Sequence, residues 1–213
     1  WIHMQAEGAA TLRLWKDKVI ASGSLGYAPV PANTPPNKRD SISTTVSREY
    51  YVGYRPMREL GVYAGFMDHA FGIRVPDHAA YVRKQALLGM DDQTHGILLH
   101  GNSKPWEGAV HFVAGNLLQD PAIRQRGVTL MVEHETTENL RLGASLLATS
   151  SYFRARAMGE IHTRIGFAKG SSVLFELGLA RERANTGDVK LGSFVFLQPA
   201  MRLARGWYAL LTF

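Results

Sequence analysis

The stretch FRARAMGEIHTRIGF, from Phe153 to Phe167, decides the fold. Small or apolar residues alternate with mostly charged ones along all 15 of its positions. Successive side chains of a β-strand point to opposite faces, whereas a helix would mix the two sets around its circumference. The stretch therefore predicts a two-faced strand that is much longer than the usual length of about 5 or 6 residues.

The same alternation recurs on both sides of this stretch and breaks at residues typical of turns. The breaks lie at 16–18, 136–139, 169–171, 185–188 and 198–200. All nine prolines are expected in breaks or connections, because proline cannot donate to a sheet ladder. The predicted strands are 6–16, 18–28, 44–55, 58–68, 80–89, 95–101, 107–118, 126–135, 139–150, 152–168, 172–184, 189–198 and 201–213.

Composition excludes several classes of protein. The 213 residues are 46% hydrophobic and contain no cysteine, which removes disulfide scaffolds and thiolate zinc sites. The longest apolar run, counting glycine, extends only from Leu60 to Met67, far short of the roughly 20 residues of a spanning helix. The formal net charge of +6 favours anionic partners. One composition fills the whole chain, which predicts a single domain over 1–213.

Long antiparallel strands with one apolar and one polar face allow two packings. In a soluble barrel or sandwich the apolar face points inward, and in an outer-membrane barrel it points to lipid. A tilted membrane strand needs about 9 to 11 residues, which the clearest segments reach or exceed. Their polar faces interleave Gly, Ser, Thr and Ala with Arg and Glu, as a crowded wet interior would. Both features favour the membrane, and a soluble β-sandwich is the alternative.

The end of the chain carries a resemblance to a known family. The last seven residues, WYALLTF, close an amphipathic strand on a terminal phenylalanine, and this ending resembles Gram-negative bacterial outer-membrane β-barrels of the porin type. The face of Trp207, Ala209, Leu211 and Phe213 matches the signal that the barrel-assembly machinery reads in that family. The resemblance is specific for the last strand and general for the rest.

The resemblance implies a fold and a location. It implies an all-β, up-and-down antiparallel transmembrane β-barrel of about 12 strands, or 14 if an N-terminal part is missing. The barrel would lie in the outer membrane, against lipid and lipopolysaccharide, with a periplasmic C-terminus. Connections 29–43, 69–79 and 102–106 would then be extracellular. The thirteen predicted strands conflict with the even number of such barrels, so one strand is misassigned or strands precede Trp1.

The charged face of the stretch from Phe153 to Phe167, with the matching faces of its neighbouring strands, is the candidate functional site. Charged side chains at the bilayer midplane cost roughly 2–4 kcal/mol each for Arg or Lys, so this face is expected to line the lumen. Guanidinium groups along a lumen attract anions. The predicted lining residues are Arg141, Arg154, Arg156, Glu160, His162, Arg164, Glu133 and Glu176, and the predicted pore-mouth residues are Arg74, Arg83 and Lys84.

These residues predict a porin-like channel for passive passage of small hydrophilic, preferably anionic, solutes. The alternative is a salt-bridge network that plugs a narrow barrel. Such a barrel would anchor another envelope protein or a second copy of itself.

The remaining residue types give weaker signals. The eight histidines form no HExxH pattern, and we expect neither a metal nor another cofactor. Asp68-His69 and Asp77-His78 each pair a carboxylate with an imidazole, but neighbours on a strand point to opposite faces. A barrel-embedded hydrolase is therefore a lesser alternative to a non-enzymatic protein. The basic residues are spread along the strands, which argues against binding nucleic acid.

Overall fold

A computed structural model describes residues 6–27, 45–73, 92–168 and 170–212 of the chain. Every strand in these ranges belongs to one antiparallel sheet. Twelve strands follow one another in chain order, and β3 is a two-residue strand that pairs with the last two residues of β2. The strands are β1 (Ala6–Leu14), β2 (Val19–Tyr27), β3 (Thr45–Val46), β4 (Tyr50–Met57), β5 (Leu60–Met67), β6 (Thr94–Ser103), β7 (Trp106–Gly115), β8 (Arg126–Thr137), β9 (Leu140–Ser150), β10 (Arg154–Ala168), β11 (Ser171–Ala184), β12 (Val189–Ala204) and β13 (Trp207–Leu210).

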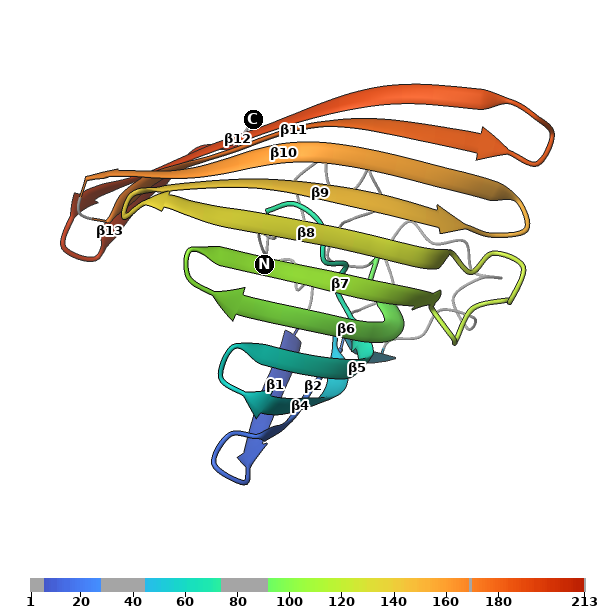
Figure 1. The fold of residues 1–213 in the computed structure, drawn as a ribbon, viewed down its shortest axis with the longest axis horizontal. Coiled ribbons are helices and arrows are strands. Elements are labelled where there is room, and N and C mark those ends of the chain that lie inside the picture. The colour runs from blue at the N-terminus through green and yellow to red at the C-terminus, as the bar shows by residue number, and fades with distance from the viewer. Residues whose placement is uncertain (1–5, 28–44, 74–91, 169, 213) are drawn as a thin grey trace.

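The order of the strands confirms the predicted all-β, up-and-down architecture of 12 strands. Figure 1 shows that the sheet twists and curves around a concave side. Within the described residues β1 and β13 are not paired with each other, so the sheet is open at that seam. The part of the chain that the structure describes contains no helix long and apolar enough to cross a membrane.

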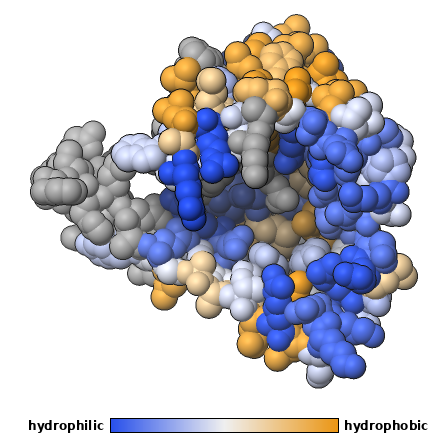
Figure 2. All heavy atoms as spheres, turned by 90° about the vertical axis from the view of Figure 1, so that its left-hand side faces the viewer, coloured by the Kyte–Doolittle hydropathy of each residue, from blue (hydrophilic) through white to orange (hydrophobic). Residues whose placement is uncertain are grey.

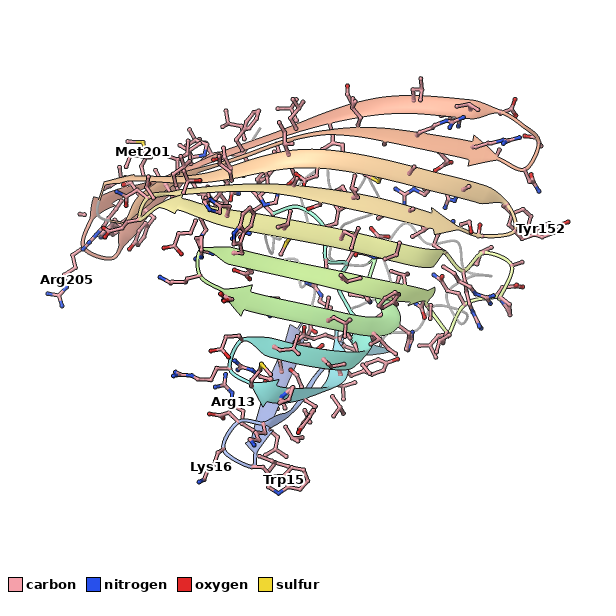
Figure 3. All side chains as sticks on the ribbon, viewed as in Figure 1. Arg13, Trp15, Lys16, Tyr152, Met201 and Arg205 are labelled. Carbon is pink, nitrogen blue, oxygen red and sulfur yellow. The ribbon has the colours of Figure 1, made fainter. Side chains whose placement is uncertain are left out.

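The connections divide the molecule into two ends. Tight hairpins join β1 to β2, β4 to β5, β6 to β7, β8 to β9, β10 to β11 and β12 to β13, and we call this the hairpin end. The opposite, long-connection end carries the links from β2 to β4, from β5 to β6 and from β7 to β8. In Figure 3, Lys16 and Arg205 mark the hairpin end and Tyr152 marks the other.

The predicted grouping of connections was partly wrong. Connections 29–43 and 69–79 belong to the long-connection end, but 102–106 belongs to a tight hairpin at the opposite end. The error follows from the predicted strand 80–89, which lies outside the described residues. Because β5 pairs directly with β6, no strand lies between them in the sheet. Counting one strand too many reversed the direction of the earlier part of the chain.

Two prolines correct the predicted strand boundaries. Pro56 lies within β4, at a β-bulge between Tyr54 and Met57, which is where a strand tolerates proline. Pro199 lies within β12, and its carbonyl accepts a hydrogen bond from Leu211 N at 3.2 Å, so its backbone faces the short edge strand β13. The predicted break at 198–200 and the single strand 201–213 were therefore wrong. The turn lies instead at Arg205 and Gly206, where the glycine φ of +82° suits a tight hairpin.

The two faces of the sheet differ in the way that the alternation predicts. On the convex face, apolar side chains are exposed, including Leu146 at 59%, Ile161 at 59% and Leu179 at 68%. On the concave face, Thr129, Glu160 and His162 are buried. Viewed from the hairpin end in Figure 2, hydrophilic residues surround a hollow, and hydrophobic residues gather on the periphery.

Candidate functional site

The structure places all eight predicted lining residues on the concave face. Their side chains share this face because they occupy alternate positions on β8, β9, β10 and β11. Seven of them form two groups with neighbouring residues, and the eighth, Glu176, accepts a hydrogen bond from the backbone of Ile73. Sequence reasoning had not assigned Glu107 or His100 to this face. The central network consists of His100, Glu107, Glu133, Glu135, Arg141, Glu160, His162 and Arg164. The end cluster consists of Arg154, Arg156 and Glu182.

His162 is the centre of the central network. Its Nε2 lies 2.8 Å from Glu133 Oε1 and its Nδ1 lies 3.0 Å from Glu160 Oε1. Both carboxylates are acceptors, so this geometry requires both ring nitrogens to donate. All three side chains are at most 3% exposed. The result is a buried charged triad that links β8 to β10 and stiffens this part of the sheet. We call the concave face of β7 to β11 the wall.

Two arginines extend the network towards the hairpin end. Arg164 Nη2 lies 2.7 Å from Glu133 Oε1, which is the shortest contact of the network. Arg141 spans three acidic residues, with nitrogen–oxygen distances of 3.2 Å to Glu107, 3.4 Å to Glu135 and 3.7 Å to Glu133. These arginines are about 40% exposed, so they border the hollow while their partners lie deeper.

The end cluster lies at the opposite end of the wall. Arg154 Nη1 and Arg156 Nε lie 3.5 Å and 3.7 Å from the same atom, Glu182 Oε2. The side chain of Arg156 is only 8% exposed, and its Nη2 also contacts the sulfur of Met158 at 3.5 Å. Two guanidinium groups therefore share one carboxylate near the long-connection end.

The wall is close to electrically balanced. Every one of the four predicted arginines has a carboxylate within 4 Å. On β7 to β11 the concave face also carries six carboxylates, those of Glu107, Glu133, Glu135, Glu160, Glu176 and Glu182. A paired guanidinium attracts a passing anion less than a free one does, because its partner cancels much of its field.

A short segment after β5 packs on this wall, and we call residues 68–73 the inner segment. The backbone N–H of Gly72 donates to Ser145 Oγ at 2.9 Å, and that of Ile73 donates to Glu176 Oε2 at 3.2 Å. Phe71 is 1% exposed and packs with Leu147 and Met158. The sequence predicts only that 69–79 is a connection, and the described part of that connection turns onto the wall. The signal that could have identified it is Ala70-Phe71-Gly72-Ile73, an apolar run inside a connection.

The other predicted site residues are placed less completely. The mouth residues Arg74, Arg83 and Lys84 lie outside the described residues. Of the predicted assembly signal, Trp207 and Ala209 lie on β13, and Leu211 follows the strand. Phe213 is not described.

The proposed Asp/His pairs are only half described. Asp68 accepts a hydrogen bond from Gln93 Nε2 at 3.0 Å, whereas the ring of His69 packs near that of His111, with ring centroids 5.9 Å apart. Asp77 and His78 lie outside the described ranges. No group of three or more metal-ligating side chains gathers within the ranges that are described.

Solved structures share this fold, although no protein-family model and no curated protein sequence matches the chain. The in-vitro folded trimer form of OmpT, an outer membrane protein of Vibrio cholerae, matches with a TM-score of 0.53 and 12% identity, covering 98% of this chain and 79% of that one. A loop L8 deletion mutant of OmpT matches with a TM-score of 0.51 and 12% identity, covering 98% and 84%. The fold is therefore that of an outer-membrane β-barrel protein, as the C-terminal residues suggested.

Proposed function

We propose that this chain forms a porin-like wall in a bacterial outer membrane, through which small hydrophilic solutes pass without expenditure of energy. The observation that carries the proposal is the opposition of the two faces of one sheet. The convex face exposes Leu146, Ile161 and Leu179, which water disfavours and lipid accepts. The concave face carries the central network and the end cluster beside a hollow (Figure 2).

The ion preference of this channel depends on how the wall charges combine. Four arginines favour anions, and six glutamates in the same wall oppose them. We therefore propose that the charges of the wall by themselves give only a weak preference between anions and cations. The predicted preference for anions then rests chiefly on the mouth residues Arg74, Arg83 and Lys84.

A second candidate function is supported by the inner segment. Phe71 and Ile73 are each 1% exposed against the wall, so this segment occupies part of the hollow. A barrel filled in this way would serve as an anchor or a partner of another envelope protein, or assemble with copies of itself. A barrel-embedded hydrolase has less support from the described pair, because Asp68 accepts a hydrogen bond from Gln93 while the His69 ring packs near His111.

The orientation in the membrane is inferred from the connections. Outer-membrane barrels have short periplasmic turns and longer extracellular loops, so we propose that the hairpin end faces the periplasm. The strand β13 runs away from the hairpin end as far as Leu210. With the hairpin end in the periplasm, β13 would run towards the extracellular side, whereas the sequence-based prediction places the C-terminus in the periplasm. Chemical labelling of the two ends decides between the two orientations.

The test is a measurement of single-channel conductance and reversal potential in planar bilayers. Stepwise conductance supports a channel, and insertion without conductance supports the plugged barrel. The variant Arg156→Glu reverses a charge on the wall and should shift the reversal potential towards cation preference. Arg183→Glu reverses a charge on the convex face and serves as the matched control. Equal reversal potentials for the two variants would remove Arg156 from the conducting path.

A further inference from the structure

An unused group of arginines lies on the convex face near the long-connection end. The registers align Arg126 on β8 with Ser150 on β9, Ser150 with Ala155 on β10, and Ala155 with Arg183 on β11. Arg181 lies two residues before Arg183 on the same face. We call Arg126, Arg181 and Arg183 the outer arginines. Neighbouring strands are about 4.8 Å apart, so Arg126 and Arg183 stand about 14 Å apart across three strand spacings.

The outer arginines differ from the arginines of the concave wall. All three are exposed, and within the described residues none of them forms an ion pair. The side chains between them are small, because Ser150 and Ala155 separate Arg126 from Arg183. Long arginine side chains on both sides of this low floor can therefore converge on one anion.

An apolar groove of about 720 Å³ lies over β5 to β10, and ten of its fifteen lining residues belong to the convex face while the other five, His100 and Glu160 among them, belong to the concave face. The next positions inward from Ser150 and Ala155 are Ala148 and Ala157, which pair with each other and continue the low floor. The groove follows, and its lining on this face includes Leu130, Val132, Ala144, Leu146 and Ile161. The outer arginines and the groove thus form one continuous surface, cationic at one end and apolar along its length.

We propose that this surface binds an anionic phospholipid, whose headgroup phosphate is not neutralised by a cationic group, with the phosphate between the outer arginines and an acyl chain in the groove. Guanidinium groups match phosphate geometry through paired N–H donors, which provides the charge complementarity. A free anion would leave the groove unused, and a wholly apolar partner would leave three arginines unpaired. The assignment rests on the proposed membrane location and specifies a lipid class for it.

The test is native mass spectrometry of the full chain refolded in detergent and incubated with equal amounts of phosphatidylglycerol and phosphatidylcholine. We expect the wild type to retain phosphatidylglycerol preferentially. The double variant Arg126→Gln/Arg183→Gln should weaken this retention by about tenfold, as the loss of charged hydrogen bonds implies. The control Arg205→Gln, in the hairpin-end turn, should bind like the wild type.

A separate variant tests the proposed position of the acyl chain. Ala157→Leu places a large side chain on the low floor that leads to the groove, and it should weaken retention of phosphatidylglycerol without changing any charge. Soluble glycerol phosphate at the same concentration should not displace the lipid, and if it does, the surface is an anion site only. Equal retention of the two lipids by the wild type, or unchanged retention by the double variant, would overturn the proposal. Bilayer conductance is measured in a separate experiment. The lipid site can therefore be disproved without disproving the channel, and the channel can be disproved without disproving the lipid site.

Discussion

His162 reaches Glu133 across a strand that separates them: its Nε2 lies 2.8 Å from Glu133 Oε1, although β10 and β8 are both paired to β9 and not to each other. Both residues are aligned with Gly143 of β9. A Cβ at position 143 would collide with His162 Nε2. The absence of a side chain at Gly143 is therefore what allows the ring to span the strand.

The first prediction tests this requirement with Gly143→Ala. The added methyl group should displace the His162 ring and destabilise the fold by about 1–3 kcal/mol, as overpacking does. The measurement is the free energy of unfolding in urea, in detergent micelles, followed by tryptophan fluorescence. The matched control is Gly192→Ala on β12, where an added Cβ meets nothing within 4 Å. If both variants unfold at the same urea concentration, the ring does not depend on Gly143.

Glu133→Gln tests how much the buried carboxylate of Glu133 contributes to the free energy of unfolding. Glu133→Gln leaves His162 and Arg164 without their shared negative partner, and removing one member of a buried ion pair costs about 3–5 kcal/mol. Glu135→Gln, at the more exposed edge of the same network, should cost only about 0–1 kcal/mol. The same urea experiment compares the two. A similar loss in both variants would contradict the central role of Glu133.

The third prediction concerns the inner segment. Phe71→Ala removes a ring buried against Leu147 and Met158, and such a truncation costs about 3–5 kcal/mol when it occurs in a core. If the segment narrows the lumen, single-channel conductance should rise because the segment is held less tightly. Phe153→Ala removes an exposed phenylalanine, 48% accessible, and should leave conductance unchanged. Unchanged conductance in both variants would mean that the inner segment does not limit the pore.

The fourth prediction concerns pH. Burial, with smaller contributions from His111 and Arg156, lowers the pKa of His69 from its ordinary 6.5 to about 3 in the folded protein. An undocked inner segment gains a proton on His69 below pH 6.5, and the docked segment does not. Docking should therefore weaken progressively as the pH falls from about 6.5 towards 3, and be unaffected above that window.

The readout for His69 is conductance at pH 7.4 and at pH 4.5. The wild type should conduct more at the lower pH. His69→Asn cannot take up the proton, so it should lose this difference. A pH effect of equal size in the variant would assign the change to another titratable group and not to His69.

The fifth prediction concerns orientation. The chain contains no cysteine, so a single introduced cysteine reports its own position. With the hairpin end in the periplasm, Asp120→Cys in the β7–β8 connection should react on intact cells with a membrane-impermeant maleimide. Lys16→Cys in the β1–β2 hairpin should react only after the outer membrane is opened. The reverse pattern would support a periplasmic C-terminus.

Local pattern was enough to predict much of this molecule. The alternation from Phe153 to Phe167 predicts a strand, the faces of its side chains and the side on which Arg156, Glu160 and His162 lie, because side-chain direction in a strand repeats every two residues. The antiparallel order follows from the turns at 136–139, 169–171 and 185–188, since short turns join strands that are neighbours. These features depend only on residues close together in the chain.

Tertiary structure alone decided the rest. The continuation of β12 through Pro199 depends on which neighbour its backbone faces, and the pairing of β5 with β6 depends on residues that a long connection separates. The link from His162 to Glu133 crosses Gly143, and the packing of Phe71 on β9 and β10 brings a connection onto the wall. Pairing partners across strands and the path of a long connection are set by the register and curvature of the whole sheet, which no single stretch of sequence encodes.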